Sequence, residues 1–315
     1  EETPPDFVFA IKGGRFITHF RKLREPRVPL ANFFASGLLC LREKLGPILW
    51  QFPPFMPFDE DRFKGFFDLL PRDTMELARL AHEHDSPRRR PVELEADENR
   101  PVRHAVEFRH ESFLTDRFTT LLARHNIALV VADVASKFPT AEDVTADWVY
   151  VRLHGSRQLY ASGYTPREIK SWAEKVSAWH EGRQPTNARL IDPDGKSVLK
   201  PGKKTDGDLG NPAERNSRGK PGNQPTGSVT VLTSGNSKRR SGTNTNGELR
   251  SRSPGDSGRS SRGVAARNKR DVFVFFDNTD VKLRAPVDAR SLMRELGLGP
   301  DATPGEIVRE LKDGG

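Results

Sequence analysis

The chain has 315 residues, a formal net charge of +8 and only 35% hydrophobic residues, which is low for a compact protein of this length. Its single cysteine, Cys40, excludes an intrachain disulfide, and no stretch approaches the roughly 20 apolar residues of a membrane span. The positive charge is concentrated in residues 182–270, which hold 19 basic and 7 acidic residues, whereas the rest of the chain is mildly acidic. The net charge of the whole chain therefore does not by itself indicate nucleic-acid binding.

Short apolar runs alternate along the chain with segments whose apolar residues recur at helical spacing. The strands that these runs predict are, in chain order, 7–13, 47–53, 104–110, 127–133, 148–155 and 271–278. The predicted helices are 29–45, 59–70, 73–84, 115–125, 165–181 and 285–296. Pro166 suits the first turn of one helix, and Asp73 with Glu76 suits a capping box at the start of another. This alternation is typical of an α/β protein with a parallel sheet covered by helices.

Nearly every predicted strand is apolar until its last residues and then becomes polar. The residues at these ends are Lys12, Gln51, Glu107, Arg109, His110, Asp133, Arg152, His154, Asp277 and Asn278. The carboxyl ends of parallel strands meet at one edge of a sheet, where ligands of such folds bind. We therefore predict one shared polar site, to which His19, in the loop after the first strand, also contributes. Gln51 is expected to be structural.

Two sets of side chains are candidates for the chemistry of this site. The candidates for catalysis, as general acids and bases, are Glu107, His110, His154 and Asp277. The candidates for substrate binding are Lys12, Arg109, Arg152, Asp133 and His19. The competing interpretation is that these charges form a structural ion-pair network at the end of the sheet.

Other notable residues are expected to be structural. Cys40 is predicted to be a small buried residue within its helix. Tryptophans predicted to pack in the core or against helices are Trp148, Trp172 and Trp179. Histidines predicted to lie at the surface or to cap helices are His104, His125 and His180.

A series of motifs resembles the YecE-like family, which is filed as domain of unknown function 72. The motifs are FAIKGGRFITH (9–19), LGPILWQFPP (45–54), AVEFRHESF (105–113), VYVRLHG (149–155), the series Tyr160, Tyr164 and Trp172-Ala173, and VFVFFDN followed by Ala285-Pro286. They cover about 7–183 and 271–296, in order. The resemblance implies a TIM-like (β/α) barrel that is incomplete here. The usual first two strands of the family are missing from this chain, which accounts for the six predicted strands.

The resemblance also implies that residues 184–270 are an insertion before the last strand, because joining Arg183 to Asp271 restores the usual junction of the family. The segment is rich in Gly, Ser, Asn, Pro, Lys and Arg and has almost no aromatic residues, so it is predicted to be disordered. The barrel domain would then be discontinuous, formed by 1–183 and 271–315.

Three classes of function are compatible with these features. Carboxylates and histidines beside Lys and Arg suit an enzyme acting on a small anionic, phosphorylated or sugar-like ligand, and a divalent metal is a candidate cofactor. The basic insertion 184–270 could instead bind nucleic acid through salt-dependent contacts. A barrel without its first two strands would otherwise be an inactive, truncated copy. We expect a cytoplasmic protein with no membrane segment.

Overall fold

The computed structural model of the chain describes residues 3, 7–85, 93–159, 162–191, 229–233, 269–277 and 284–298. The expectations for Tyr160 and Asn278 fall outside these ranges. So does most of segment 184–270, and with it the expectation that this segment is disordered and binds nucleic acid.

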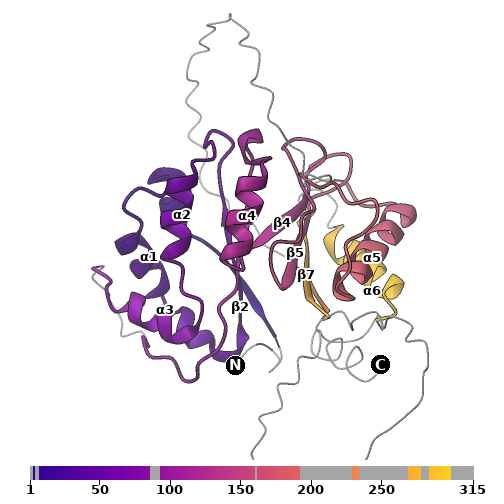
Figure 1. The fold of residues 1–315 in the computed structure, drawn as a ribbon. Coiled ribbons are helices and arrows are strands. Elements are labelled where there is room, and N and C mark those ends of the chain that lie inside the picture. Colours follow the sequence, from indigo (N-terminus) through magenta and orange to yellow (C-terminus); the bar gives the residue numbers. More distant parts are fainter. Residues whose placement is uncertain are drawn as a thin grey trace, which may run out of the picture.

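A seven-stranded sheet lies at the centre of the molecule, and six of its strands run parallel. In spatial order the parallel strands are β1 (Phe9–Lys12), β2 (Leu45–Gln51), β3 (His104–Glu107), β4 (Ala128–Asp133), β5 (Trp148–Leu153) and β7 (Asp271–Phe276). They correspond one to one to the six predicted strands, and they curl into a half-barrel (Figure 1). The predicted α/β class is confirmed, and the described part of the chain provides six parallel strands of a barrel.

Three parts of segment 184–270 belong to the described structure, one of which is residues 269–270, directly before β7. Strand β6 (Val229–Thr233) pairs antiparallel with β7 and forms an edge of the sheet. Residues 184–191 lie against the loop that follows β4, where the Gln184 amide donates to the Glu142 carbonyl at 2.7 Å and the Ile191 N–H donates to Asp143 at 3.1 Å. These eight residues therefore contact the barrel domain.

Helices cover the outer face of the sheet (Figure 1). They are α1 (Arg27–Phe34), α2 (Glu60–Asp68), α3 (Thr74–Ala81), α4 (Asp116–Arg124), α5 (Pro166–His180) and α6 (Ala285–Glu295). Shorter helical turns occur at η1 (Phe16–Phe20), η2 (Leu38–Lys44) and η3 (Glu111–Phe113). Among the described residues, none of the helices combines the length and the apolar composition needed to cross a membrane.

The starts of the helices follow from local capping. Asp73 accepts a hydrogen bond from the Glu76 N–H at 2.8 Å, as predicted, although the Glu76 carboxylate reaches back to the Arg72 N–H. At α5, Thr165 and Glu168 form a complete capping box and Pro166 occupies the first turn. Each cap satisfies backbone donors that the helix itself leaves unpaired.

The prediction of a single helix at 29–45 is wrong. Helix α1 ends at Phe34, because Gly37 adopts a left-handed conformation with φ of 107° that an α-helix cannot contain. The chain resumes in the tighter turns of η2 and enters β2 at Leu45. Cys40, expected to be buried, is exposed on η2.

Successive side chains along the strands point to opposite faces of the sheet, and apolar residues occupy both faces. Outward-facing residues pack against α1–α4 on one side of the molecule and against α5 and α6 on the other. A third apolar cluster lines the inner face and contains no helix residue; its buried members are Leu49, Ala105, Ala128, Val130, Ala132, Val134, Trp148, Tyr150, Phe273 and Phe275. The polar strand ends that continue this alternation define the site below. Trp148, Trp172 and Trp179 are buried, as expected.

Two of the histidines expected to lie at the surface or to cap helices, His104 and His180, are buried. His104 lies on β3 between two partners, since the Trp50 indole donates to its Nδ1 at 3.1 Å and its Nε2 donates to the Pro71 carbonyl at 2.8 Å. Burial lowers the pKa of His104 to about 4, so the ring is neutral at pH 7. His180, at the end of α5, donates from Nδ1 to the Arg270 carbonyl at 2.9 Å. Each ring therefore links neighbouring segments through a hydrogen bond to a backbone carbonyl and is shielded from solvent.

Candidate functional site

The centre of the candidate site is Arg152, near the end of β5. Its guanidinium donates to Glu107 of β3 and, at 2.5 Å, to Asp277 just after β7. Glu107 lies two strands away, and the intervening strand β4 presents only Ala132 beside Arg152, so nothing large stands between them. Glu107, Arg152 and Asp277 each lie two residues after an apolar residue of the inner face. Side chains two residues apart on a strand point in the same direction, so all three charged groups meet on that face.

A second arginine completes the environment of Glu107. The Arg109 Nε donates to the other carboxylate oxygen at 3.1 Å, and the guanidinium lies 4.6 Å from the centre of the Phe138 ring. Burial by itself would raise the pKa of Glu107, but the charges of Arg152 and Arg109 hold it at about 2. Glu107 is only 2% exposed, so it is an ionised carboxylate enclosed by protein.

His154 lies next to this network. Its ring is fully buried, and Nδ1 is 3.5 Å from the Asp277 carboxylate. Burial, reinforced by the positive charge of Arg152, lowers the pKa of His154 to about 4. The imidazole therefore contributes no charge at neutral pH.

Lys12, at the end of β1, supplies the third cation of the cluster. Its ammonium group donates to the side-chain oxygen of Gln51 at 3.0 Å, which gives Gln51 the structural role expected of it. Burial and the charge of Arg152 lower the pKa of Lys12. Within the described residues this amine hydrogen-bonds only to the neutral amide, so its charge has no directly bonded carboxylate.

His19 lies close to the same cluster. It belongs to η1, directly after β1, and its Nδ1 is 2.8 Å from the Thr18 hydroxyl. Burial and the charges of Arg15, Lys12 and Arg109 lower its pKa, which places His19 within electrostatic reach of the site.

Two predicted site residues are not brought into the cluster. His110 lies beyond β3, which ends at Glu107, and caps η3 by accepting the Ser112 N–H on Nδ1 at 3.1 Å. Asp133 lies two residues after Val131, so its side chain is on the outer face of the sheet, where it hydrogen-bonds to Tyr164. Burial raises the pKa of Asp133.

Asp133 lines a separate small pocket at the same end of the sheet. The pocket has a volume of about 320 Å³, and the hydroxyls of Ser136, Thr140 and Ser156 are part of its lining. Phe138 lines it as well, so the ring beneath Arg109 also forms a wall of this pocket. The pocket therefore adjoins the charged cluster.

Three residues of the site were not assigned a role in it from the sequence. Tyr150 lies two residues before Arg152 on the same face, and this spacing could have indicated it; burial raises the pKa of its hydroxyl. Phe138 lies in a loop with no periodic pattern. Tyr164 accepts the Gly155 N–H at 3.0 Å and stands before α5, where sequence indicates only a helix start.

The described residues hold no group of three or more His, Cys, Asp or Glu side chains that could bind a metal. Both oxygens of Glu107 are already occupied by arginines. The arrangement is an ion-pair network with an adjoining polar pocket.

Comparison with known proteins gives a family model and a solved structure. The model described as "Protein of unknown function DUF72" matches residues 1–200. No curated protein matches the chain. The chain is similar to the crystal structure of a DUF72 family protein from Thermotoga maritima, with 25% sequence identity and a TM-score of 0.41. That match covers 56% of this chain and 63% of the other, so it spans less than two thirds of that protein.

Proposed function

This chain belongs to the DUF72 family of proteins of unknown function, and we propose that it binds and acts on a small anionic ligand, phosphorylated or sugar-like, at the carboxyl ends of its parallel strands. One observation carries the proposal: the cluster contains more positive than negative charge. Its cations are Lys12, Arg109 and Arg152, and its anions are Glu107 and Asp277. Because His154 is neutral, one positive charge is left for a ligand to compensate.

Lys12 is the group best placed to contact the anion. Arg152 is held between two carboxylates, so its role is to position them. Among the described residues, the Lys12 ammonium hydrogen-bonds only to the neutral Gln51 amide, so it can form a charge-assisted hydrogen bond with an incoming anion. Arg109, anchored to Glu107 on one side and stacked on Phe138, extends the same positive surface toward the pocket.

The adjoining pocket suits a hydroxyl-rich group. Its volume of about 320 Å³ lies at the small end of the range for ligand sites. The hydroxyls of Ser136, Thr140 and Ser156 and the carboxyl of Asp133 can exchange hydrogen bonds with the hydroxyls of a sugar. A phosphorylated sugar would thus place its charge near Lys12 and its hydroxyls in the pocket.

The pKa shifts identify two positioning groups. Glu107 stays ionised and His154 stays uncharged near neutral pH. We therefore assign a positioning role to Glu107 and His154, and anion binding to Lys12.

Calorimetric titration of the full chain tests this proposal. Inorganic phosphate, a hexose phosphate and the unphosphorylated hexose are the probes, and Lys12→Met is the variant. Loss of one charge-assisted hydrogen bond should weaken binding of the hexose phosphate about 10- to 100-fold. Lys170→Met, on the exposed side of α5, is the matched control and should bind as the wild type does. Equal affinity for the charged and uncharged hexose, or unchanged binding by Lys12→Met, would contradict the proposal.

A further inference from the structure

Residues 184–191 form a strap along the barrel domain that reaches the candidate site. The strap begins near the amino ends of the strands, because α5 ends at His180 and the His180 ring bonds to the Arg270 carbonyl directly before β7. It ends beside the carboxyl end of β4, where Arg189 lines the pocket of about 320 Å³. Eight extended residues can span about 28 Å, and a strand of six residues is about 20 Å long. The strap is therefore long enough to connect the two ends of the sheet.

Contacts at both ends hold the strap in place. The Gln184 amide donates to the Glu142 carbonyl at 2.7 Å, and the Glu142 N–H donates to the Arg189 carbonyl at 2.8 Å. Pro185 is buried, and Ile191 packs against the apolar cluster beneath helices α1–α4. The backbone of Arg189 is therefore fixed at the edge of the pocket.

The carboxylate beside Arg189 is already neutralised by another group. Glu142 is buried and accepts hydrogen bonds of 2.7 Å from Lys175 on both of its oxygens. Arg189 adds one longer bond of 3.4 Å, from Nε to Glu142. Its two terminal amino groups have no hydrogen-bond partner within the described residues, and the side chain is 62% exposed. These amino groups are available to donate to a ligand.

The pocket combines this donor with an acceptor. The carboxyl of Asp133 also lines the pocket and lies within electrostatic reach of Arg189. A hydroxyl group can accept a hydrogen bond from Arg189 and donate one to Asp133, whereas an anionic oxygen can only accept. The three serine and threonine hydroxyls of the lining have the same double capacity. The pocket therefore suits the neutral hydroxyls of a sugar better than a second phosphate.

We propose that Arg189 binds the hydroxyl groups of the sugar and thereby makes the site prefer a phosphorylated sugar to free phosphate. This inference rests on the proposed function, in which Lys12 binds the phosphate, and it assigns a specificity-determining residue to the same site. The planar guanidinium can donate two parallel hydrogen bonds to neighbouring oxygens of the sugar. The strap is thus part of the ligand site, although it begins the segment that was predicted to be a disordered insertion.

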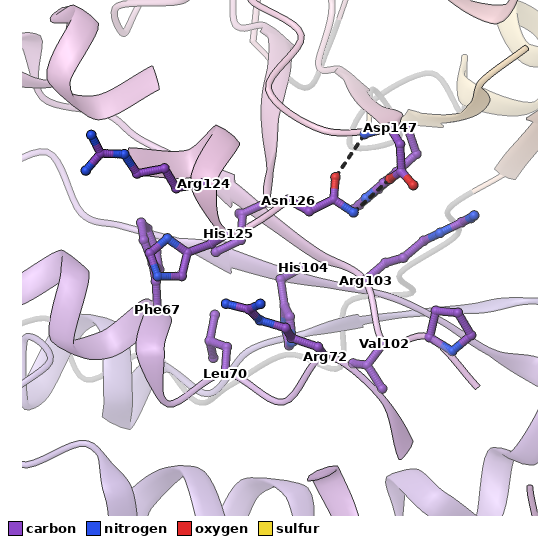
Figure 2. A pocket seen from close by; sticks show the side chains of 13 residues that line it. Phe67, Leu70, Arg72, Val102, Arg103, His104, Arg124, His125, Asn126 and Asp147 are labelled. Carbon is purple, nitrogen blue, oxygen red and sulfur yellow. Dashed lines mark hydrogen bonds between the residues drawn. The ribbon is translucent and has the colours of Figure 1, made fainter. Parts of the chain in front are cut away.

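A second pocket provides an internal control for nonspecific binding. It lies at the amino ends of the strands, has a volume of about 510 Å³ and is lined in part by Arg72, Arg103 and Arg124. Figure 2 shows that these guanidinium groups do not converge on one point, and that Asn126 and Asp147 hydrogen-bond to each other, at 2.9 and 3.0 Å. The amide of Asn126 therefore reports on anions attracted to surface arginines in general.

Calorimetric titration of the full chain with glucose-6-phosphate and with inorganic phosphate tests the inference. Arg189→Met should weaken glucose-6-phosphate binding about 10- to 100-fold and leave inorganic phosphate binding unchanged, whereas Lys12→Met should weaken both. Arg167→Met, at an exposed position on α5, is the matched control and should bind both as the wild type does. Because Arg189 is exposed, the variant is expected to fold, and the chemical shift of the Glu142 amide shows whether the strap stays in place.

The outcomes separate this inference from the proposed function. Unchanged glucose-6-phosphate affinity in Arg189→Met, or an equal loss for both ligands, would overturn the role of Arg189 in binding the sugar. An equal loss in Arg167→Met, or a shift of the Asn126 amide as large as that of the Glu142 amide, would also overturn it, because binding would then be nonspecific. If Lys12→Met binds both ligands as the wild type does, the proposed function fails and the role of Arg189 is judged by its own variant. Both fail if the wild type binds neither ligand.

Discussion

Replacement of Glu107 by glutamine tests the charge network most directly. The change keeps the size of the side chain and removes its charge. Arg152 would then keep only Asp277 as a carboxylate partner, and Arg109 would lose the carboxylate to which it is bound. Breaking a buried ion pair from one side costs about 3–5 kcal/mol, because the remaining charge is left uncompensated.

The pKa of Glu107 gives an independent value for the same loss. Burial raises it, but the neighbouring arginines hold it at about 2, below the value of about 4.5 for a free glutamate. A carboxyl with this difference contributes about 3 kcal/mol of stability at neutral pH. The folded-state pKa is the lower one, so the contribution is complete above about pH 4.5 and is lost as the pH falls toward 2.

Urea unfolding of the wild type and of Glu107→Gln, at pH 7 and at pH 3, measures both effects. We expect the variant to be about 3–5 kcal/mol less stable at pH 7 and the difference to shrink at pH 3. Glu111→Gln, at an exposed position on η3, is the matched control and should change stability by less than about 0.5 kcal/mol. A loss below about 1 kcal/mol for Glu107→Gln, or a difference that does not depend on pH, would refute the reasoning.

Two further predictions concern local packing and capping, and both are checked by thermal or urea unfolding. Gly13→Ala should destabilise the fold by about 1–3 kcal/mol, since a Cβ there would lie 2.3 Å from the Trp50 ring, whereas Gly65→Ala, in helix α2 with nothing within 4 Å, should stabilise it by up to about 1 kcal/mol. Equal effects of the two substitutions would contradict the packing argument. Thr165→Ala removes the cap shared with Glu168 and should cost about 1 kcal/mol; no loss would show that the α5 cap does not contribute to stability.

The order of strands and helices could be predicted because apolar periodicity is a local property of the sequence. The six parallel strands and most of the helices lie within a few residues of the predicted ranges. The exception, at 29–45, shows where periodicity is insufficient. Apolar residues there keep helical spacing across Gly37, but its left-handed conformation redirects the chain and exposes Cys40. The pairing of β6 with β7 was not predicted, because its segment is short and surrounded by Gly, Ser and Asn.

Polar strand ends correctly indicated that Glu107, Arg152 and Asp277 lie together. The same rule was wrong for Asp133, although the alternation of side-chain directions along β4 predicts where Asp133 points. Ala132 is register partner to Arg152 on the inner face, so the next residue must point outward. His110 was misplaced for a different reason. The strand ends three residues earlier, and the imidazole is used to cap the turn that follows.

The number of charges at the carboxyl ends of the strands is a poor guide to what binds there. Two of the three cations, Arg109 and Arg152, are bound to the buried carboxylate of Glu107, and Lys12 is the group left for a ligand. What the site can bind depends on the charge that remains after the protein's own pairs are formed.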